Sequence, residues 1–244
     1  MSDAHGDKAG ATTTGGDTEQ DAYTGKDGYT GKVTVGGPAD TRTLPGLTVT
    51  KVAVGPADNN AYLLRCPVTG EQLLIDAANE ADTLLRLVGD AGLATVVTSH
   101  RHGDHVQALA EVVAATGATT VAHADDAPQI PVPTVRVVRD GDEITVGRAT
   151  LRAIHLVGHT PGSIALLYDA DPAAPHLFTG DCLFPGGPGN TFGNADAFVT
   201  LMDDLERKVF GPLPDTTWIY PGHGFDSTIG TERPHLAEWR ARGW

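Results

Sequence analysis

Histidine and aspartate side chains gather at four places along this sequence of 244 residues, and both are common ligands of metal ions. The full set of candidate metal ligands is His100, His102, Asp104, His105, His159, Asp181 and His223. Imidazole nitrogens and carboxylate oxygens suit zinc, and also iron or manganese. Because the set contains no cysteine, a structural thiolate site is disfavoured.

The number of candidate ligands bears on the number of ions. Seven side chains exceed the four ligands that one tetrahedral zinc needs. If all seven converge, two divalent ions sharing one carboxylate are the economical interpretation, with zinc as the first choice. In the alternative that stays open, one or two of these residues are only outer partners of a single ion.

Each group of candidate ligands directly follows a predicted strand. The strand-like runs 96–99, 154–158, 177–180 and 218–222 lead to His100, His159, Asp181 and His223, respectively. Loops after the carboxyl ends of strands are where open α/β sheets usually bind ligands. The pattern therefore predicts one site built from four loops.

The remaining pattern predicts an α/β fold. Short β-branched or aliphatic runs between Gly, Pro and Asn signals predict strands at 47–54, 61–66, 72–75, 119–122, 135–138, 144–146, 149–157, 164–168, 177–179 and 217–220. Helical apolar spacing predicts helices after an Asn79 N-cap, over about 105–116 with Gly117 as its stop, over the stretch from Phe198 to Val209, and near 236–240. Interleaved strands and helices predict sheets covered by helices in a single domain.

The first 40 residues differ in composition from the rest. Gly, Thr, Asp and Lys dominate them, without an apolar period that could offset the entropy of ordering the chain. We expect residues 1–40 to be a disordered tail and residues 41–244 to form the catalytic domain. Inside the tail, Tyr-Thr-Gly-Lys at 23–26 is repeated at 29–32, which is most simply a duplication in an unconstrained segment.

Charge and cysteine content exclude several classes of partner. A net charge of −14 repels phosphate backbones and anionic lipid, so we expect a small-molecule substrate and neither nucleic acid nor a membrane as partner. No signal-peptide core and no apolar run long enough to span a bilayer is visible. Two cysteines, Cys66 and Cys182, are too few for a disulfide framework, which favours a cytoplasmic location. The oligomeric state is not predicted.

The motifs resemble those of the metallo-β-lactamase superfamily. Its HxHxDH hallmark is present at 100–105, and its later motifs follow in order as Gly-His-Thr-Pro-Gly-Ser at 158–163, Gly-Asp at 180–181 and Pro-Gly-His-Gly at 221–224. The resemblance implies an αββα sandwich in which two mixed β-sheets are flanked by helices. It also implies that one ion is held by His100, His102 and His159, the other by Asp104, His105 and His223, with Asp181 bridging them.

A hydrolase of the glyoxalase II type is the function that this resemblance favours. Two ions would lower the pKa of a bound water to about 7 and supply hydroxide, which Asp104 would orient as the catalytic residue. Segments 58–64, 180–184 and 227–233 look similar to thioesterases of the hydroxyacylglutathione hydrolase branch. The stretch 187–190, however, reads Gly-Pro-Gly-Asn where glutathione enzymes commonly have Gly-Cys-Gly-Arg, which leaves the thiol carrier open.

Two alternatives remain within the same superfamily. A mononuclear iron persulfide dioxygenase looks similar overall and would bind iron through two histidines of the first motif and Asp181. A lactonase or another ester hydrolase would use the same pair of ions. The metal content and the substrate separate these alternatives.

Overall fold

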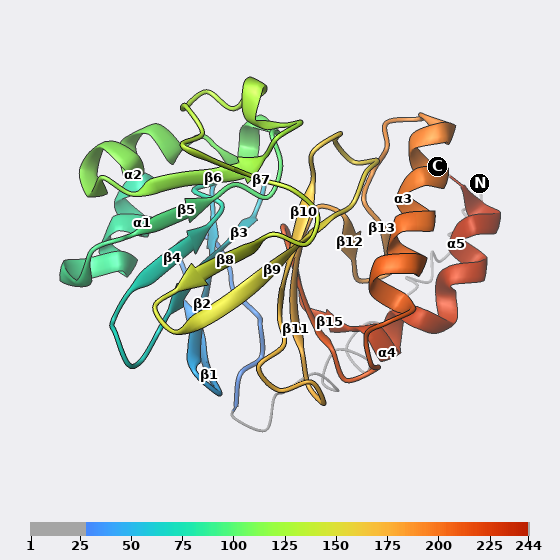
Figure 1. Cartoon of the computed structure of the whole chain (residues 1–244), viewed down its shortest axis with the longest axis horizontal. Helices are drawn as coiled ribbons and strands as arrows, with labels where there is room; N and C mark the ends of the chain where they lie inside the picture. The colour runs from blue at the N-terminus through green and yellow to red at the C-terminus, as the bar shows by residue number, and fades with distance from the viewer. Residues whose placement is uncertain (1–27, 244) are drawn as a thin grey trace, which may run out of the picture.

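The computed structural model describes residues 28–243, whose strands form two large sheets and one short hairpin (Figure 1). In the first sheet spatial order follows chain order: β1 (Asp40–Leu44), β2 (Leu47–Val54), β3 (Asn59–Arg65), β4 (Gln72–Ile75), β5 (Thr95–Val97), β6 (Thr119–His123) and β7 (Arg136–Val138). Neighbours are antiparallel from β1 to β4 and parallel from β4 to β7. The sheet is therefore mixed.

The second sheet is also mixed. Its spatial order is β15 (Ser227–Thr228), β14 (Trp218–Pro221), β11 (His176–Gly180), β10 (Ile164–Tyr168), β9 (Ala149–His155) and β8 (Glu143–Val146). Only β11 and β14 pair in parallel, so their carboxyl ends lie at the same edge. The hairpin joins β12 (Leu183–Phe184) to β13 (Gly187–Pro188).

Helices lie on the outer sides of the two sheets (Figure 1). The α-helices are α1 (Ala81–Val88), α2 (Leu109–Thr116), α3 (Ala195–Asp204), α4 (Ile229–Glu232) and α5 (Leu236–Arg242). Short 3-10 turns cover Gly89–Ala91, Gly103–His105, Ala127–Gln129 and Arg233–His235, and a π-helical segment, Leu205–Phe210, continues α3. Among residues 28–243, no helix is both long and apolar enough to cross a membrane.

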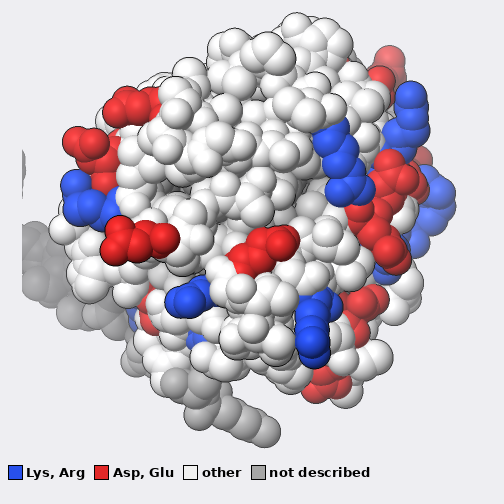
Figure 2. Space-filling view, turned by 60° about the vertical axis from the view of Figure 1, so that its left-hand side comes forward, with Lys and Arg blue, Asp and Glu red and all other residues white. Residues whose placement is uncertain are grey.

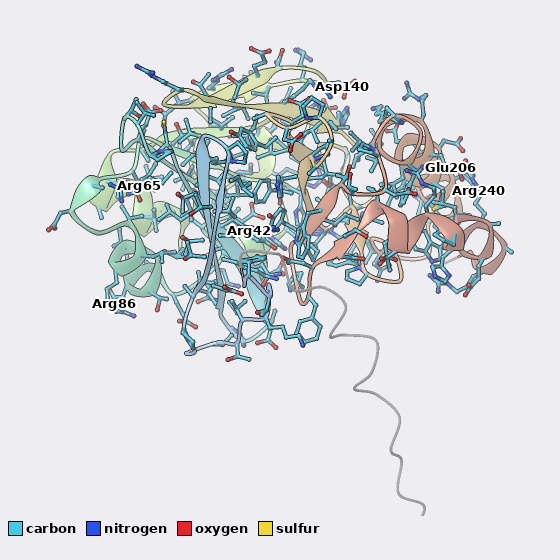
Figure 3. The ribbon with its side chains drawn as sticks, turned by 90° about the horizontal axis from the view of Figure 1, so that it is seen from below. Arg42, Arg65, Arg86, Asp140, Glu206 and Arg240 are labelled. Carbon is cyan, nitrogen blue, oxygen red and sulfur yellow. The ribbon has the colours of Figure 1, made fainter. Side chains whose placement is uncertain are left out.

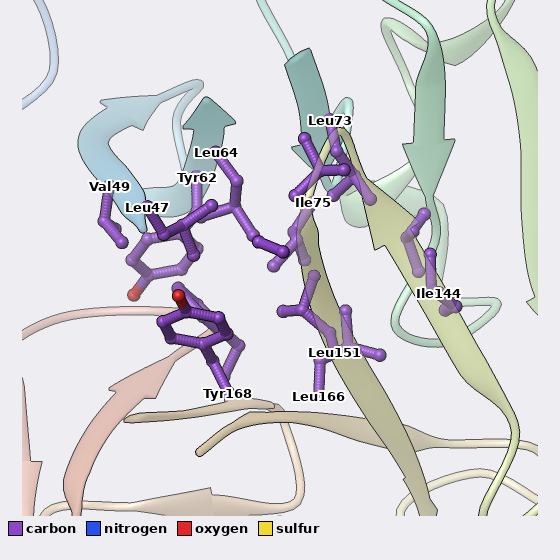
Figure 4. Close-up of a cluster of buried hydrophobic side chains, with 14 of the residues drawn as sticks. Leu47, Val49, Tyr62, Leu64, Leu73, Ile75, Ile144, Leu151, Leu166 and Tyr168 are labelled. Atoms are coloured by element: carbon purple, nitrogen blue, oxygen red, sulfur yellow. The ribbon is translucent and has the colours of Figure 1, made fainter. Parts of the chain in front are cut away.

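Three separate apolar layers hold these elements together. Successive side chains of a strand point to opposite faces. In β3, Tyr62 and Leu64 face the layer between the sheets, whereas Leu63 faces the layer under α1 and α2. The residues labelled in Figure 4 show the middle layer, with Leu47, Val49, Tyr62, Leu64, Leu73 and Ile75 opposite Ile144, Leu151, Leu166 and Tyr168. A third layer joins the second sheet to α3 and α5. The predicted αββα sandwich is therefore confirmed.

The predicted disorder as far as residue 40 is wrong for residues 28–40. Tyr29 is only 1% exposed and belongs to the middle apolar layer, and β1 already begins at Asp40. The neighbours of Tyr29 in the sequence are mostly small or polar. The sequence therefore shows no apolar period that would have predicted its burial. Residues 1–27, which include the first copy of the repeat, lie outside the described residues.

Several predicted boundaries also shift. The helix expected from about His105 begins at Leu109, because Gly103–His105 forms a 3-10 turn that contains two of the candidate ligands. Asn79 is not the N-cap of α1: that position belongs to Glu80, whose amide donates to the Asn79 side chain. Gly117 ends α2 in the left-handed conformation as predicted. The predicted helix as far as Val209 is α-helical to Asp204 and π-helical beyond it.

Candidate metal centre

All seven candidate ligands lie together at the edge where strands of both sheets end. His100 to His105 follow β5, His159 follows β9, Asp181 follows β11, and His223 follows β14. Two sets of three side chains, and a third group that joins His100 and His105 to Asp181, each bring their ligand atoms within 4.8 Å of one another and could hold a metal ion. The four loops, which lie far apart in the sequence, thus form one site.

The first set consists of three imidazole nitrogens. His102 Nδ1 lies 2.9 Å from His159 Nε2, which lies 3.3 Å from His100 Nε2. These three nitrogens face a common point from two loops. The set could hold one ion with neutral nitrogen ligands.

The second set consists of two imidazoles and a carboxylate. His105 Nε2 lies 3.2 Å from His223 Nε2, and Asp104 Oδ2 lies 3.3 Å from His223 Nε2 and 3.6 Å from His105 Nε2. The Asp104 side chain is 37% exposed and that of His223 is 25% exposed, whereas His105 is fully buried. Solvent therefore reaches the site on the side of Asp104 and His223.

Asp181 lies between the two sets. Its Oδ2 is 3.6 Å from His159 Nε2 and 3.5 Å from His223 Nε2, and its Oδ1 is 3.3 Å from His105 Nε2. One carboxylate thus faces ligand atoms of both sets. Gly222 permits this approach, because a Cβ at that position would stand 2.0 Å from Asp181 Oδ1.

Outer hydrogen bonds orient the imidazoles toward the centre. His159 Nδ1 donates to the Asn190 carbonyl over 2.8 Å, and His223 Nδ1 donates to the Ala57 carbonyl over 2.8 Å. Since a carbonyl oxygen can only accept, the proton of each neutral ring sits on Nδ1 and the lone pair of Nε2 faces the site.

One buried carboxylate that we did not predict organises the first motif. Asp76, which is 1% exposed, accepts from His105 Nδ1 over 2.9 Å and from the Ser99 hydroxyl over 2.7 Å. Because the Ser99 hydroxyl donates to Asp76, its oxygen accepts from His100 Nδ1 over 3.0 Å. A single carboxylate thereby fixes one imidazole of each set. The sequence contained a signal for this residue, because Asp76 directly follows the predicted strand at 72–75. Asp181 follows the strand-like run 177–180 in the same way.

Asn59 is a further residue whose place the sequence did not reveal. Its side-chain amide donates to Asp104 Oδ2 over 3.0 Å, and its backbone forms an isolated bridge with His223. An Asn-Asn pair is also common in turns, so the sequence pattern favoured a structural role. In the structure Asn59 holds the carboxylate of the second set.

Burial and neighbouring charges shift the pKa values of the cluster in opposite directions. Burial, the largest influence, and the nearby His105 hold the pKa of His100 well below its usual value. Burial also disfavours charge on His105, but the Asp76 carboxylate and then Asp181 outweigh it and raise the pKa of His105 to about 10. Burial would raise the pKa of Asp181, but His105 and His223 outweigh burial and lower it well below its usual value.

The donor set fits divalent cations. Among the described residues, Asp181 Oδ1 is one of two buried side-chain polar atoms without a hydrogen-bond partner. Around it, the outer hydrogen bonds leave acceptor lone pairs of several imidazoles facing a carboxylate. Acceptors that converge in a buried place are stabilised by positive charge between them, which a divalent cation supplies. Imidazole and carboxylate ligands suit zinc, iron and manganese alike.

The chain matches the family model described as the metallo-beta-lactamase superfamily over residues 54–223, which includes every candidate ligand. The chain belongs to the metallo-beta-lactamase superfamily. Within this superfamily it is 36% identical over 185 residues to the hydroxyacylglutathione hydrolase of Polaromonas sp., covering 73% of this chain. It spans 63 to 67% of the length of the hydroxyacylglutathione hydrolases that it matches.

Two solved structures are also similar to this chain. ETHE1 from Myxococcus xanthus matches with a TM-score of 0.67 and 31% identity over 79% of this chain and 84% of its own. TTHA1623, solved in a di-iron-bound form, matches with a TM-score of 0.64 and 31% identity over 75% of this chain and 96% of its own. The two sheets and their flanking helices are therefore a shared architecture.

Another group with metal-ligand chemistry, His123, Asp125 and His155, lies outside the centre. The two histidine rings stack with their centroids 3.8 Å apart and their planes at 23°, so their in-plane lone pairs run side by side and do not converge. His123 Nδ1 accepts from the Asp125 amide, and His155 Nε2 donates to the Pro161 carbonyl over 2.7 Å. The contact between His155 and Pro161 holds the loop that carries His159.

Proposed function

We propose that this protein is a dinuclear metal-dependent hydrolase that cleaves a thioester of a low-molecular-weight thiol. The observation that carries the proposal is Asp181, whose two oxygens face ligand atoms of two separate sets. In this proposal one ion is held by His100, His102 and His159, the other by Asp104, His105 and His223, with Asp181 shared.

The chemistry follows from the ions and from the residues beside them. When bound, two divalent ions lower the pKa of water and polarise an ester carbonyl. Asp104 is partly exposed and held by Asn59, so its carboxylate can accept a hydrogen bond from the attacking water and orient it. Partial burial would raise the pKa of Asp104, but the Asn59 hydrogen bond and His105 lower it, which keeps this carboxylate ionised and able to accept the hydrogen bond from water.

A cavity of about 530 Å³ adjoins the centre and supports a small-molecule substrate. It is lined by Phe184, Pro185, Gly186, Gly187, Pro188, Asn190 and Arg242. The Phe184 ring lies 6.3 Å from that of His223, and the Asn190 carbonyl holds His159, so the cavity opens beside both sets. We propose that it receives the thiol portion of the thioester.

The proposal also includes zinc as the bound metal, a cytoplasmic location and no nucleic-acid partner. Both cysteines, Cys66 and Cys182, are free and buried, which supports a reducing compartment. The net charge of −14 opposes binding to a phosphate backbone. On the face shown in Figure 2, lysine and arginine side chains are interspersed with acidic ones.

An iron-dependent persulfide dioxygenase is the second candidate, which the likeness to ETHE1 favours. It would need one iron and two histidines with Asp181. In such a dioxygenase the second set, Asp104, His105 and His223, would have no role in catalysis. Because that set is complete and is organised by Asp76 and Asn59, the hydrolase is the better supported of the two.

A thioester panel with metal quantified in the same preparation tests the proposal. The panel contains S-lactoylglutathione, S-formyl thiols and a simple lactone. We expect two metal ions per chain and release of a free thiol from at least one thioester. One iron per chain with oxygen uptake on glutathione persulfide would overturn the hydrolase, and turnover of the lactone alone would move the activity to a lactonase.

A further inference from the structure

A fully buried ion pair lies behind the loop that carries His223. Lys51 Nζ is 2.7 Å from Asp226 Oδ1, and the two side chains are 0% and 1% exposed. Lys51 Nζ also donates to the carbonyls of Gly31 and Gly224, each over 2.8 Å. All three hydrogens of the ammonium group are therefore used.

The N-terminal segment completes the environment of this pair. Asp226 Oδ2 accepts from the Tyr29 hydroxyl over 2.9 Å and from Trp218 Nε1 over 3.0 Å. Arg42, labelled in Figure 3, packs its guanidinium over the rings of Tyr29 and Trp218 at 4.9 and 4.5 Å. Tyr29 and Gly31 thus provide one partner to each member of the pair.

Gly31 is the residue that allows this close approach. It has a φ of +66°, and a Cβ built on it would stand 2.4 Å from Asp226 Oδ2. The amides of Thr30 and Gly31 both donate to Asp40 Oδ2 over 2.9 Å, which fixes the segment to the start of β1. Any larger residue at position 31 must displace the segment or the carboxylate.

The pair reaches the metal centre through the backbone on both sides of His223. The Gly224 carbonyl accepts from Lys51 Nζ and from the Asn60 side chain, over 2.8 and 2.9 Å. The Pro221 carbonyl accepts from the same Asn60 side chain and from the Tyr62 hydroxyl over 2.6 Å. The backbone on both sides of His223 is therefore held by contacts in which Lys51 takes part.

We infer that residues 29–31 are a positioning element for the second set of metal ligands, acting through the Lys51–Asp226 pair on His223. Without the segment, the pair loses a hydrogen bond on each side and becomes open to water. Buried charges that lose their partners rearrange to regain them. The loop that Lys51 holds then relaxes, whereas the set of His100, His102 and His159 keeps its own supports. The inference rests on the proposed pair of ions but not on thioester cleavage.

The test compares Gly31→Ala with Gly36→Ala in the full chain. Gly36 has a φ of +74°, and a methyl group added there would have nothing within 4 Å, so this variant carries the same backbone strain without the clash. Zinc affinity is measured by chelator competition. Loss of a direct partner of a metal ligand weakens metal binding about 10- to 100-fold, and residues 29–31 act through Lys51, so we expect Gly31→Ala to lose about tenfold in affinity for one of two ions. The other ion and all binding to Gly36→Ala should be unchanged.

If Gly31→Ala folds poorly, the variant Tyr29→Phe and a hydrogen-exchange measurement on the metal-free chain still test the inference. Tyr29→Phe removes one hydroxyl and keeps the buried ring. Hydrogen exchange of the metal-free chain should show faster exchange at residues 221–226 in both variants than in Gly36→Ala, with unchanged exchange at residues 98–105. Exchange at 221–226 equal to that of Gly36→Ala, or equal weakening of both ions, would overturn the inference. If the wild type binds a single ion, the dinuclear proposal fails, and the exchange measurement still decides the role of the segment.

Discussion

Replacing Asp76 with asparagine perturbs the carboxylate that orients one imidazole in each set. The backbone of Asp76 has a φ of +59°, which asparagine tolerates well, so we expect the variant to fold. If the asparagine oxygen keeps the Ser99 amide bond of 2.7 Å, its NH₂ group faces His105 Nδ1. His105 must then give up its Nδ1 hydrogen bond or place its proton on Nε2, where it blocks metal binding.

The size of the effect follows from that lost bond. A hydrogen bond to a charged group contributes about 1.5–3 kcal/mol, and about 1.4 kcal/mol corresponds to a factor of ten. We therefore expect the ion held with His105 to bind roughly 10- to 100-fold more weakly. The effect on the other ion should be smaller, because Asp76 reaches His100 only through Ser99.

Chelator competition on the purified variant measures both affinities. Glu232→Gln is the matched control, since Glu232 is also a buried carboxylate, 3% exposed, that accepts from Gly186 N and the Ser227 hydroxyl. We expect the control to bind both ions as the wild type does. Two ions bound by Asp76→Asn with wild-type affinity would refute the reasoning that Asp76 sets the tautomer of His105.

Three further predictions concern the same centre. Asp181→Ala should lower metal content and hydrolytic activity together, and two tightly retained ions in this variant would refute its shared position. His155→Ala should keep both metal equivalents by elemental analysis, whereas loss of a full equivalent would make His155 a ligand. Because the pKa of His105 rises from 6.5 to about 10 in the metal-free chain, the stability contributed by its protonated form is complete below pH 6.5 and is lost as the pH rises toward 10. The Tm of the metal-free chain should therefore fall over this range, and it should fall less in Asp76→Asn; an equal fall in both chains would contradict this cause.

Local patterns in the sequence were enough to predict the fold class and the members of the cluster. Strands at 47–54, 72–75 and 164–168 match β2, β4 and β10 in their bounds, because short β-branched or aliphatic runs and flanking turn residues act within a few positions. Each group of candidate ligands lies in the loop that follows a strand, so its place at the edge of a sheet was also a local property.

Only the tertiary structure decided what surrounds the cluster. Asp76 and Asn59 touch candidate ligands through contacts that join different loops, and no spacing in the chain reports such contacts. The burial of Tyr29 depends on Asp226, 197 residues away, so its segment has the composition of a disordered tail and still packs into the core. The sequence by itself determined which residues are candidate metal ligands, since side-chain chemistry and local strand pattern are enough for that. Their orientation was decided by the fold, because the partners that hold each ring come from distant parts of the chain.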